Sequence, residues 1–212
     1  MYLSEIKLNH ARRDTARLLA SPQRIHAAVL DGFPSLDGER ILWRLDQGLR
    51  HESKIYVVSP DRPDFTSIHE LYSWSRLPYE ESIRTADYSR LITRLEGGEQ
   101  WGFRLRANTV KKKSVPREGK NDRITRVPVP ENEVSHWLTS REEAIGVSFT
   151  DFSSDTSIDT FNRKGNKMTL QSTEFEGVLT VVDPDRFRNA LINGIGPAKA
   201  HGCGLITISR TI

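Results

Sequence analysis

The chain has 212 residues and a net charge of +3, and its 36% hydrophobic and 28% charged residues exclude a disordered or fibrous protein. The length fits two small domains, and no apolar run approaches the roughly 20 residues that span a bilayer. The amino terminus lacks a secretion signal and Cys203 is the only cysteine, so we expect a protein of the reducing cytoplasm without an internal disulfide.

The first half of the chain has the pattern of a strand, a helix, two strands, a helix and a strand. Tyr2, Ile6 and Leu8 occur with the alternation of an opening strand. Ser21 and Pro22 supply an N-cap and a first-turn proline for a helix. The expected elements are a strand over 2–8, a helix over 22–32, strands over 41–46 and 54–59, a helix over 65–72 and a strand within 79–88.

His26 follows Ile25 on the first predicted helix. If Ile25 faces the sheet, His26 is rotated by about 100° toward the edge of the buried stripe, which is a cleft position. An imidazole there can transfer protons near neutral pH, although a partly exposed surface histidine is the more common alternative. The other histidines have no spacing that demands a metal, and GxSxG and HExxH motifs are absent from the sequence. We therefore expect neither a metal nor another cofactor.

The second half repeats the order of elements of the first. The expected strands cover 102–107, 146–152, 168–182 and 205–208, with helices over 131–145 and 184–193 and a further β-rich run at 123–129. Both halves thus predict the β-α-β-β-α-β order, and so an α+β fold of two tandem ferredoxin-like (RRM-like) domains over residues 1–90 and 95–212. This fold supports many unrelated functions and does not identify one.

Residues 101–126 carry a charge of +7, from nine Lys or Arg against two acidic residues, which leaves −4 for the rest of the chain. A basic segment on a slightly acidic body is typical of a polyanion-binding element, and a solvated charged loop is the alternative. The candidate residues for binding a polyanion are Arg104, Arg106, Lys111, Lys112, Lys113, Arg117, Lys120, Arg123 and Arg126.

The stretch GIGPAKAHGCG, residues 194–204, follows a helix and precedes a strand, so it is neither a Walker loop nor a dinucleotide fingerprint. Its glycines allow the backbone to approach a ligand, and Lys199 and His201 suit a phosphate. A tight connection with unusual dihedral angles is the alternative. The glycines are Gly194, Gly196, Gly202 and Gly204.

Six segments together resemble one family, the CasE-type CRISPR-associated endoribonucleases of type I-E systems. They are MYLS at 1–4, SPQRIH at 21–26, ILWRL at 41–45, FRLRANTVKK at 103–112, FEGVLTVVDP at 175–184 and GIGPAKAHGCGL at 194–205. The resemblance spans nearly the whole chain. It implies two ferredoxin-like domains, cleavage of the repeat hairpin of precursor CRISPR RNA, and continued binding to the guide as a subunit of the Cascade surveillance complex.

The resemblance places the catalytic histidine at His26 and the basic hairpin at about Arg104 to Arg126. Gln23 and Asp31 stand where relatives carry a tyrosine and a lysine, so charge stabilisation is expected from other cations. The candidates are Arg24, Arg163, Lys164 and Lys167, with Lys199 as a further RNA-binding residue.

RNA carries its own nucleophile, the 2′-hydroxyl, so a histidine and cations suffice for metal-independent cleavage to a 2′,3′-cyclic phosphate and a 5′-hydroxyl. His26 as the acid and His26 as the base both remain open. One competing hypothesis is a non-catalytic RNA-binding protein with two ferredoxin-like domains, although the aromatic RNP signature is absent. Another is a small-molecule enzyme that uses the glycine-rich stretch. That hypothesis does not account for the basic segment.

Overall fold

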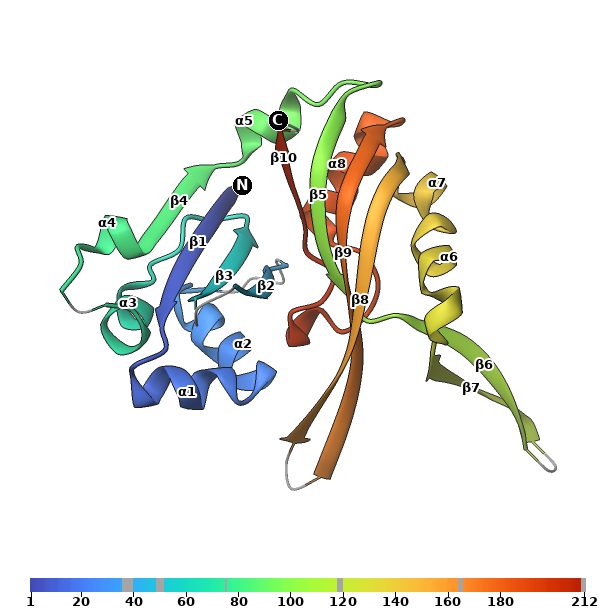
Figure 1. Cartoon of the computed structure of the whole chain (residues 1–212), viewed down its shortest axis with the longest axis horizontal. Helices are drawn as coiled ribbons and strands as arrows, with labels where there is room; N and C mark the ends of the chain where they lie inside the picture. The colour runs from blue at the N-terminus through green and yellow to red at the C-terminus, as the bar shows by residue number, and fades with distance from the viewer. Residues whose placement is uncertain (36–39, 49–51, 75, 118–119, 164–165, 211–212) are drawn as a thin grey trace.

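The computed structural model describes residues 1–35, 40–48, 52–74, 76–117, 120–163 and 166–210. Two four-stranded antiparallel sheets, one from each half of the chain, lie side by side with helices on their outer faces (Figure 1). Residues of both sheets contribute to one hydrophobic cluster, including Leu42 and Val58 from the first sheet and Leu105 and Ile206 from the second. The two halves therefore form a single body.

The first sheet has the strand order β2-β3-β1-β4. Alternation along β1 and β3 places Ile6 and Ile55 in a core with Ile25 and Val29 of the helix α2. The elements of this half are β1 (Tyr2–Asn9), α1 (Arg13–Leu19), α2 (Pro22–Asp31), β2 (Leu42–Gln47), β3 (Glu52–Ser59), α3 (Thr66–Tyr72), α4 (Tyr79–Ser82), β4 (Ile83–Asp87) and the connecting helix α5 (Ser89–Thr93).

The second sheet has the order β10-β5-β9-β8. Phe103 and Leu105 of β5 share a core with Trp137, Leu138 and Phe187 of the covering helices. The elements are β5 (Gln100–Ala107), β6 (Val110–Arg117), β7 (Lys120–Pro128), η2 (Glu131–Glu133), α6 (Val134–Thr139), α7 (Glu142–Ile145), β8 (Val147–Arg163), β9 (Asn166–Val181), α8 (Pro184–Asn193), η3 (Lys199–His201) and β10 (Ile206–Arg210).

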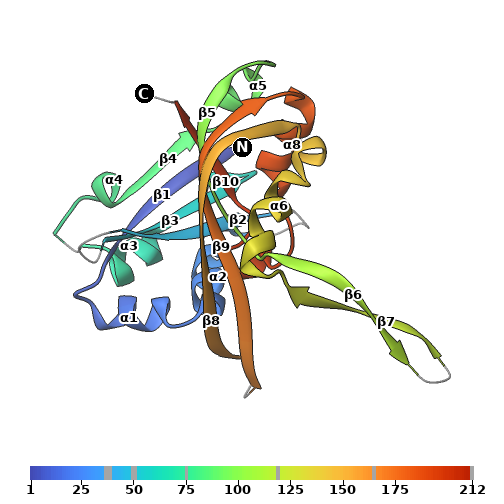
Figure 2. The ribbon, with the colours of Figure 1, turned by 45° about the vertical axis from the view of Figure 1, so that its right-hand side comes forward.

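Both sheets have the strand order of a split β-α-β unit, so the predicted α+β fold of two ferredoxin-like sheets is confirmed. Strands β6 and β7 form a separate two-stranded hairpin that projects from the body (Figure 2). None of the helices among the described residues is long and apolar enough to cross a membrane.

The structure corrects three expected elements. The loop expected before the first long helix contains α1, in which only Thr15 and Leu18 are buried. The single helix expected over 131–145 is divided into η2, α6 and α7, and the Ser140 hydroxyl donates to the carbonyl of Trp137 where α6 ends. Strands β8 and β9 are 17 and 16 residues long and extend well beyond the edge of the sheet.

Candidate functional site

Helix α2 places His26 at the junction of the two halves. Pro22 occupies the first turn of the helix, and Ile25 and Val29 are buried in the first core. His26, one position after Ile25, is half-buried at the edge of this stripe, as its spacing predicted. Helix α2 packs against η3, the short helix within the glycine-rich stretch. His26 and the glycine-rich stretch are therefore brought together from opposite ends of the chain.

Trp43 of β2 orients the His26 ring. The indole Nε1–H donates a hydrogen bond to Nδ1 of His26 at 3.2 Å, and the two rings stack with centroids 6.5 Å apart. An indole N–H can only donate, so Nδ1 must accept, and the neutral imidazole carries its proton on Nε2. Nε2 is thus the nitrogen that remains for a bound substrate.

The pKa of His26 lies below its ordinary value. Burial is the main cause, because it disfavours the charged ring, and the charge of His201 lowers the pKa further. At the pH of a cell the lowered pKa favours the neutral form of the His26 imidazole.

The glycines of residues 194–204 have positive φ angles, and one of them packs closely against Trp43. Gly194, Gly196, Gly202 and Gly204 have φ values of +71°, +75°, +76° and +96°, a region that other residues rarely adopt. A Cβ on Gly202 would lie 2.6 Å from Cζ3 of Trp43, so this glycine also permits close packing against the residue that holds His26. Lys199 donates to the carbonyl of Gly196 at 2.7 Å, and burial lowers the pKa of its ammonium.

A cleft of about 250 Å³ lies beside His26, where α2, β2, the second sheet and η3 meet. Ile25 and Trp43 line one side, and Phe161 and His201 line another. Arg106 and Asp159, paired at 2.5 Å, also line it. The cleft therefore combines imidazole, guanidinium and carboxylate groups.

Arg104 and Arg106 lie on β5, within the second sheet, and the projecting hairpin begins only at Val110. This corrects the prediction that the basic hairpin extends from about Arg104. Arg104 pairs with Asp46 at 3.3 Å and Glu176 at 2.9 Å, whereas Arg106 pairs with Asp159. Both guanidinium groups thus have acidic partners within the protein.

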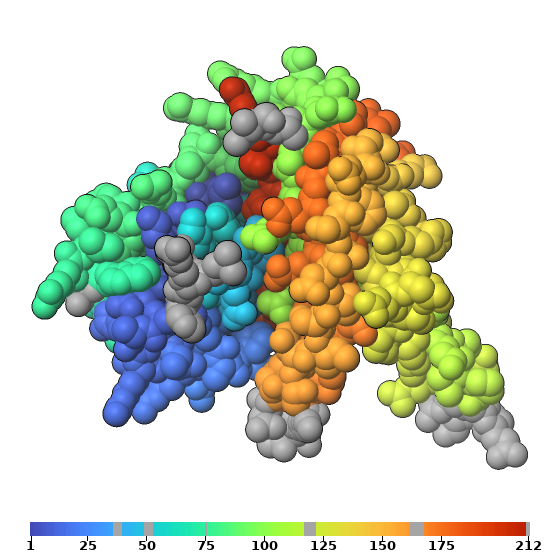
Figure 3. All heavy atoms as spheres, in the orientation of Figure 1, coloured from blue at the N-terminus to red at the C-terminus, as the bar shows by residue number. Residues whose placement is uncertain are grey.

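The β6–β7 hairpin carries the cations of the basic segment that face solvent. Lys111, Lys112 and Lys113 of β6 and Arg123 and Arg126 of β7 are exposed, and Lys111 contacts Glu133 at 2.6 Å. Arg117 and Lys120 are in the two strands, but their side chains lie outside the described part of the structure. Figure 3 shows a hollow between this hairpin and the projecting end of β8 and β9.

A second cavity, of about 650 Å³, connects the base of the hairpin with the glycine-rich stretch. Lys112 and Arg126 line it on the hairpin side, and Gly196 lines it on the other. Arg141, in the turn between α6 and α7, also lines it, and its guanidinium lies 3.7 Å from the Trp137 ring centroid. A basic surface thus runs from the hairpin toward the loop that holds η3.

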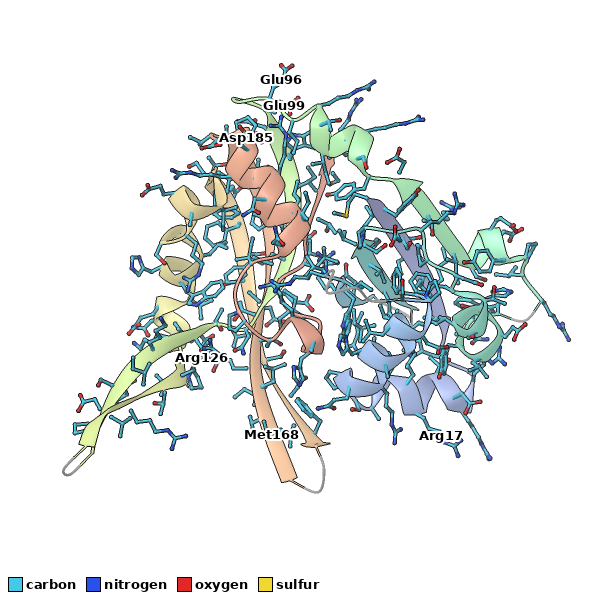
Figure 4. All side chains as sticks on the ribbon, turned by 180° about the vertical axis from the view of Figure 1, so that it is seen from behind. Arg17, Glu96, Glu99, Arg126, Met168 and Asp185 are labelled. Atoms are coloured by element: carbon cyan, nitrogen blue, oxygen red, sulfur yellow. The ribbon has the colours of Figure 1, made fainter. Side chains whose placement is uncertain are left out.

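Helix α2, which carries Arg24, and the projecting ends of β8 and β9 lie toward the same end of the molecule (Figure 1). Arg24 is exposed on α2 and donates to the carbonyl of Arg17 at 2.8 Å. Arg163 and Lys167 are at the ends of β8 and β9 with side chains that are not described, and Lys164 lies outside the described residues. Figure 4 shows Arg17, Arg126 and Met168 toward this end, whereas Glu96, Glu99 and Asp185 lie at the opposite end.

Trp43, Asp159 and the role of His201 beside His26 were not predicted. Trp43 belongs to the segment ILWRL, but nothing in the periodicity of that strand distinguishes a tryptophan that supports a histidine from an ordinary core residue. Asp159 lies in the part of β8 beyond residue 152, where no strand was predicted. Within the described ranges, no three His, Cys, Asp or Glu side chains are grouped so that they could hold a metal ion.

Comparison with known proteins gives matches over almost the whole chain. A family model described as CRISPR associated protein matches residues 1–210. The CRISPR-associated endoribonuclease Cse3 of Thermus thermophilus is 28% identical, with 99% of this chain and 100% of that protein covered. The CRISPR system Cascade subunit CasE of Escherichia coli K12 is 30% identical over 80% of this chain and 92% of that protein.

A solved structure extends the similarity to three dimensions. It is Thermus thermophilus Cse3 bound to an RNA that represents a pre-cleavage complex. The TM-score is 0.76 at 28% identity, and 98% of each chain is covered.

Proposed function

Because the chain belongs to the family of CRISPR-associated proteins, we propose that it is an endoribonuclease that cuts the repeat hairpin of precursor CRISPR RNA. The names of its relatives, an endoribonuclease and a Cascade subunit, support this proposal. The observation that carries it is the placement of half-buried His26 in contact with Trp43 and next to the glycine-rich stretch.

The cleavage proceeds by attack of the RNA's own 2′-hydroxyl on the adjacent phosphorus. The 2′-oxygen forms a bond to phosphorus, the bond to the 5′-oxygen breaks, and the products are a 2′,3′-cyclic phosphate and a 5′-hydroxyl. His26 transfers a proton in this step, to the leaving oxygen or from the attacking one. No metal ion is needed, because the nucleophile belongs to the substrate and its proton can pass to an imidazole.

The β6–β7 hairpin contacts the phosphates of the RNA stem. An A-form stem has a deep and narrow major groove, so shape and phosphate contacts dominate its recognition. The exposed side chains of Lys112, Lys113, Arg123 and Arg126 supply such contacts. The glycine-rich stretch supports the RNA backbone where it reaches His26.

After cleavage the enzyme keeps its product and remains a subunit of the type I-E surveillance complex in the cytoplasm. The name of the Escherichia coli relative as a Cascade subunit supports this part. We assign residues 1–90 to a first domain, which carries His26, and residues 95–212 to a second domain, which carries the basic hairpin.

The direct test is incubation of the protein with a labelled repeat hairpin in EDTA. The wild-type protein should cleave the hairpin. His26→Ala should bind it as well as the wild type but cleave it roughly 10²- to 10⁴-fold more slowly, the usual effect of losing a positioned acid or base. His10→Gln is the matched control, because His10 follows β1 and hydrogen-bonds to Ser53 of β3.

Binding without cleavage by the wild type would instead identify a non-catalytic RNA-binding protein. Cleavage that EDTA abolishes would contradict the metal-independent mechanism. Normal cleavage by His26→Ala would contradict the role of that residue.

A further inference from the structure

We propose that His201 is a second proton-transfer residue of the cleavage reaction and acts on the opposite side of the scissile phosphate from His26. This inference rests on the proposed function and deepens it. His201 ends η3, which packs against the helix of His26, and it lines the cleft together with Ile25 and Trp43.

Trp43 connects the two histidines structurally. Its indole N–H bonds to His26, and its six-membered ring lies against Gly202, the residue that follows His201. Gly202 has a left-handed φ of +76°, so the backbone direction immediately after His201 is set by a conformation that only glycine adopts without strain. Phe161 packs against the His201 imidazole, with the two ring centroids 5.4 Å apart. His201 therefore lies in the wall of the cleft, and His26 is held beside the cleft by Trp43, which also lines it.

In-line cleavage of RNA needs two proton transfers on opposite sides of phosphorus. One group takes the proton of the 2′-hydroxyl as the bond from the 2′-oxygen to phosphorus forms. Another gives a proton to the 5′-oxygen as its bond to phosphorus breaks. A neutral imidazole can take the first proton and a protonated imidazole can give the second. Exchange of protons with water then restores the two starting forms after each reaction.

The electrostatics of the cleft favour a single shared proton. The positive charge of His201 lowers the pKa of His26, so the doubly charged pair is disfavoured. The other charged groups around His201 are Arg106 of β5, Asp159 of β8, Glu174 of β9 and Lys199 of η3. Arg106 and Asp159 pair with each other. The thiol of neighbouring Cys203 stays neutral, because burial raises its pKa to about 12.

The test compares His26→Ala with His201→Phe, which keeps an aromatic ring against Phe161 but removes the titratable nitrogens. His201→Gln is a second variant of different shape, and His10→Gln is the control. Each catalytic variant should lose roughly 10²- to 10⁴-fold in single-turnover rate without a comparable loss of hairpin affinity. The wild-type rate should be bell-shaped in pH, and each variant should lose a different limb of the bell.

A substrate with sulfur in place of the scissile 5′-oxygen separates the two roles. A thiolate leaves without protonation, so this substrate should restore most of the rate of one variant and none of the rate of the other. Rescue of both, rescue of neither, or wild-type cleavage by both His201 variants would overturn the role of His201. If the wild-type protein does not cut the hairpin, the proposed function fails and this inference fails with it. If the wild type cuts and only His26→Ala is impaired, the inference alone fails.

Discussion

At the scale of single residues, the candidate site depends on how His26 is held. Trp43 donates a hydrogen bond to Nδ1 of His26, and burial favours the neutral ring. The glycine-rich stretch can approach Trp43 closely because Gly202 has no side chain. Gln23, at the position of the family tyrosine, accepts a hydrogen bond from the Ser21 hydroxyl at 2.6 Å. Gln23 therefore supports the start of α2.

Gly202→Ala should damage the site through Trp43. The new Cβ meets the indole at 2.6 Å, and the left-handed backbone adds strain, so we expect a loss of about 2 to 4 kcal/mol in unfolding free energy. Displacement of the indole should also slow cleavage by about 10-fold or more. Gly98→Ala is the control, because Gly98 has a φ of +87° but a Cβ at this position would have no other atom within 4 Å. Equal cleavage rates for the two variants would contradict the role of Trp43.

At the scale of elements, the β6–β7 hairpin should supply much of the electrostatic affinity for RNA. Replacing Lys111, Lys112 and Lys113 with alanine should weaken binding and reduce the dependence of affinity on salt by about one unit of slope for each phosphate that the protein no longer neutralises. Fluorescence anisotropy at several salt concentrations measures this slope. The control replaces Arg84, Arg90 and Arg94, which are exposed on β4, on α5 and just after α5. An unchanged slope for the lysine variant would exclude the hairpin as the main phosphate-binding element.

The order of the elements could be predicted from the sequence, but their extent could not. Apolar alternation and N-cap signals indicated β1, α2, β5 and α8 because each buries one regular face. The outer half of β8 has a polar sequence, from Ser153 to Thr160, because it extends beyond the core and both its faces meet solvent. Helix α1 is only seven residues long and buries two of them, too few to give a periodic signal.

At the scale of the whole molecule, Arg44 joins the two sheets. Its side chain is only 2% exposed and forms a bidentate pair with Asp46 at 2.6 and 2.9 Å. It also donates to the carbonyls of Arg104 and Leu205 and to the hydroxyl of Thr207, all in the second half of the chain. No local pattern predicts such an interaction, because it depends on how two independently patterned sheets meet. The position of the cleft between them was unpredictable for the same reason.

Arg44→Met should therefore weaken the fold and the site together. It leaves buried Asp46 with only Arg104 as a cationic partner among the described residues, and we expect a loss of about 3 kcal/mol in unfolding free energy by urea denaturation. The double variant Arg44→Met and Asp46→Leu should recover part of that loss, because no carboxylate remains unpaired. Cleavage should stay slow in both variants at temperatures where they are folded, since the junction beside His26 is altered. Wild-type cleavage by the folded single variant would show that the junction does not position the site.

The most direct test of the cleavage mechanism is a repeat hairpin in which only the scissile nucleotide lacks its 2′-hydroxyl. The wild-type enzyme should bind this RNA as tightly as the unmodified hairpin and should not cut it, because the attacking atom is gone. It should cut the unmodified hairpin in EDTA and leave a 2′,3′-cyclic phosphate, which mass spectrometry of the product identifies. Cleavage of the deoxy hairpin at the same position would contradict attack by the 2′-hydroxyl. It would also contradict the proton-transfer roles assigned to the histidines.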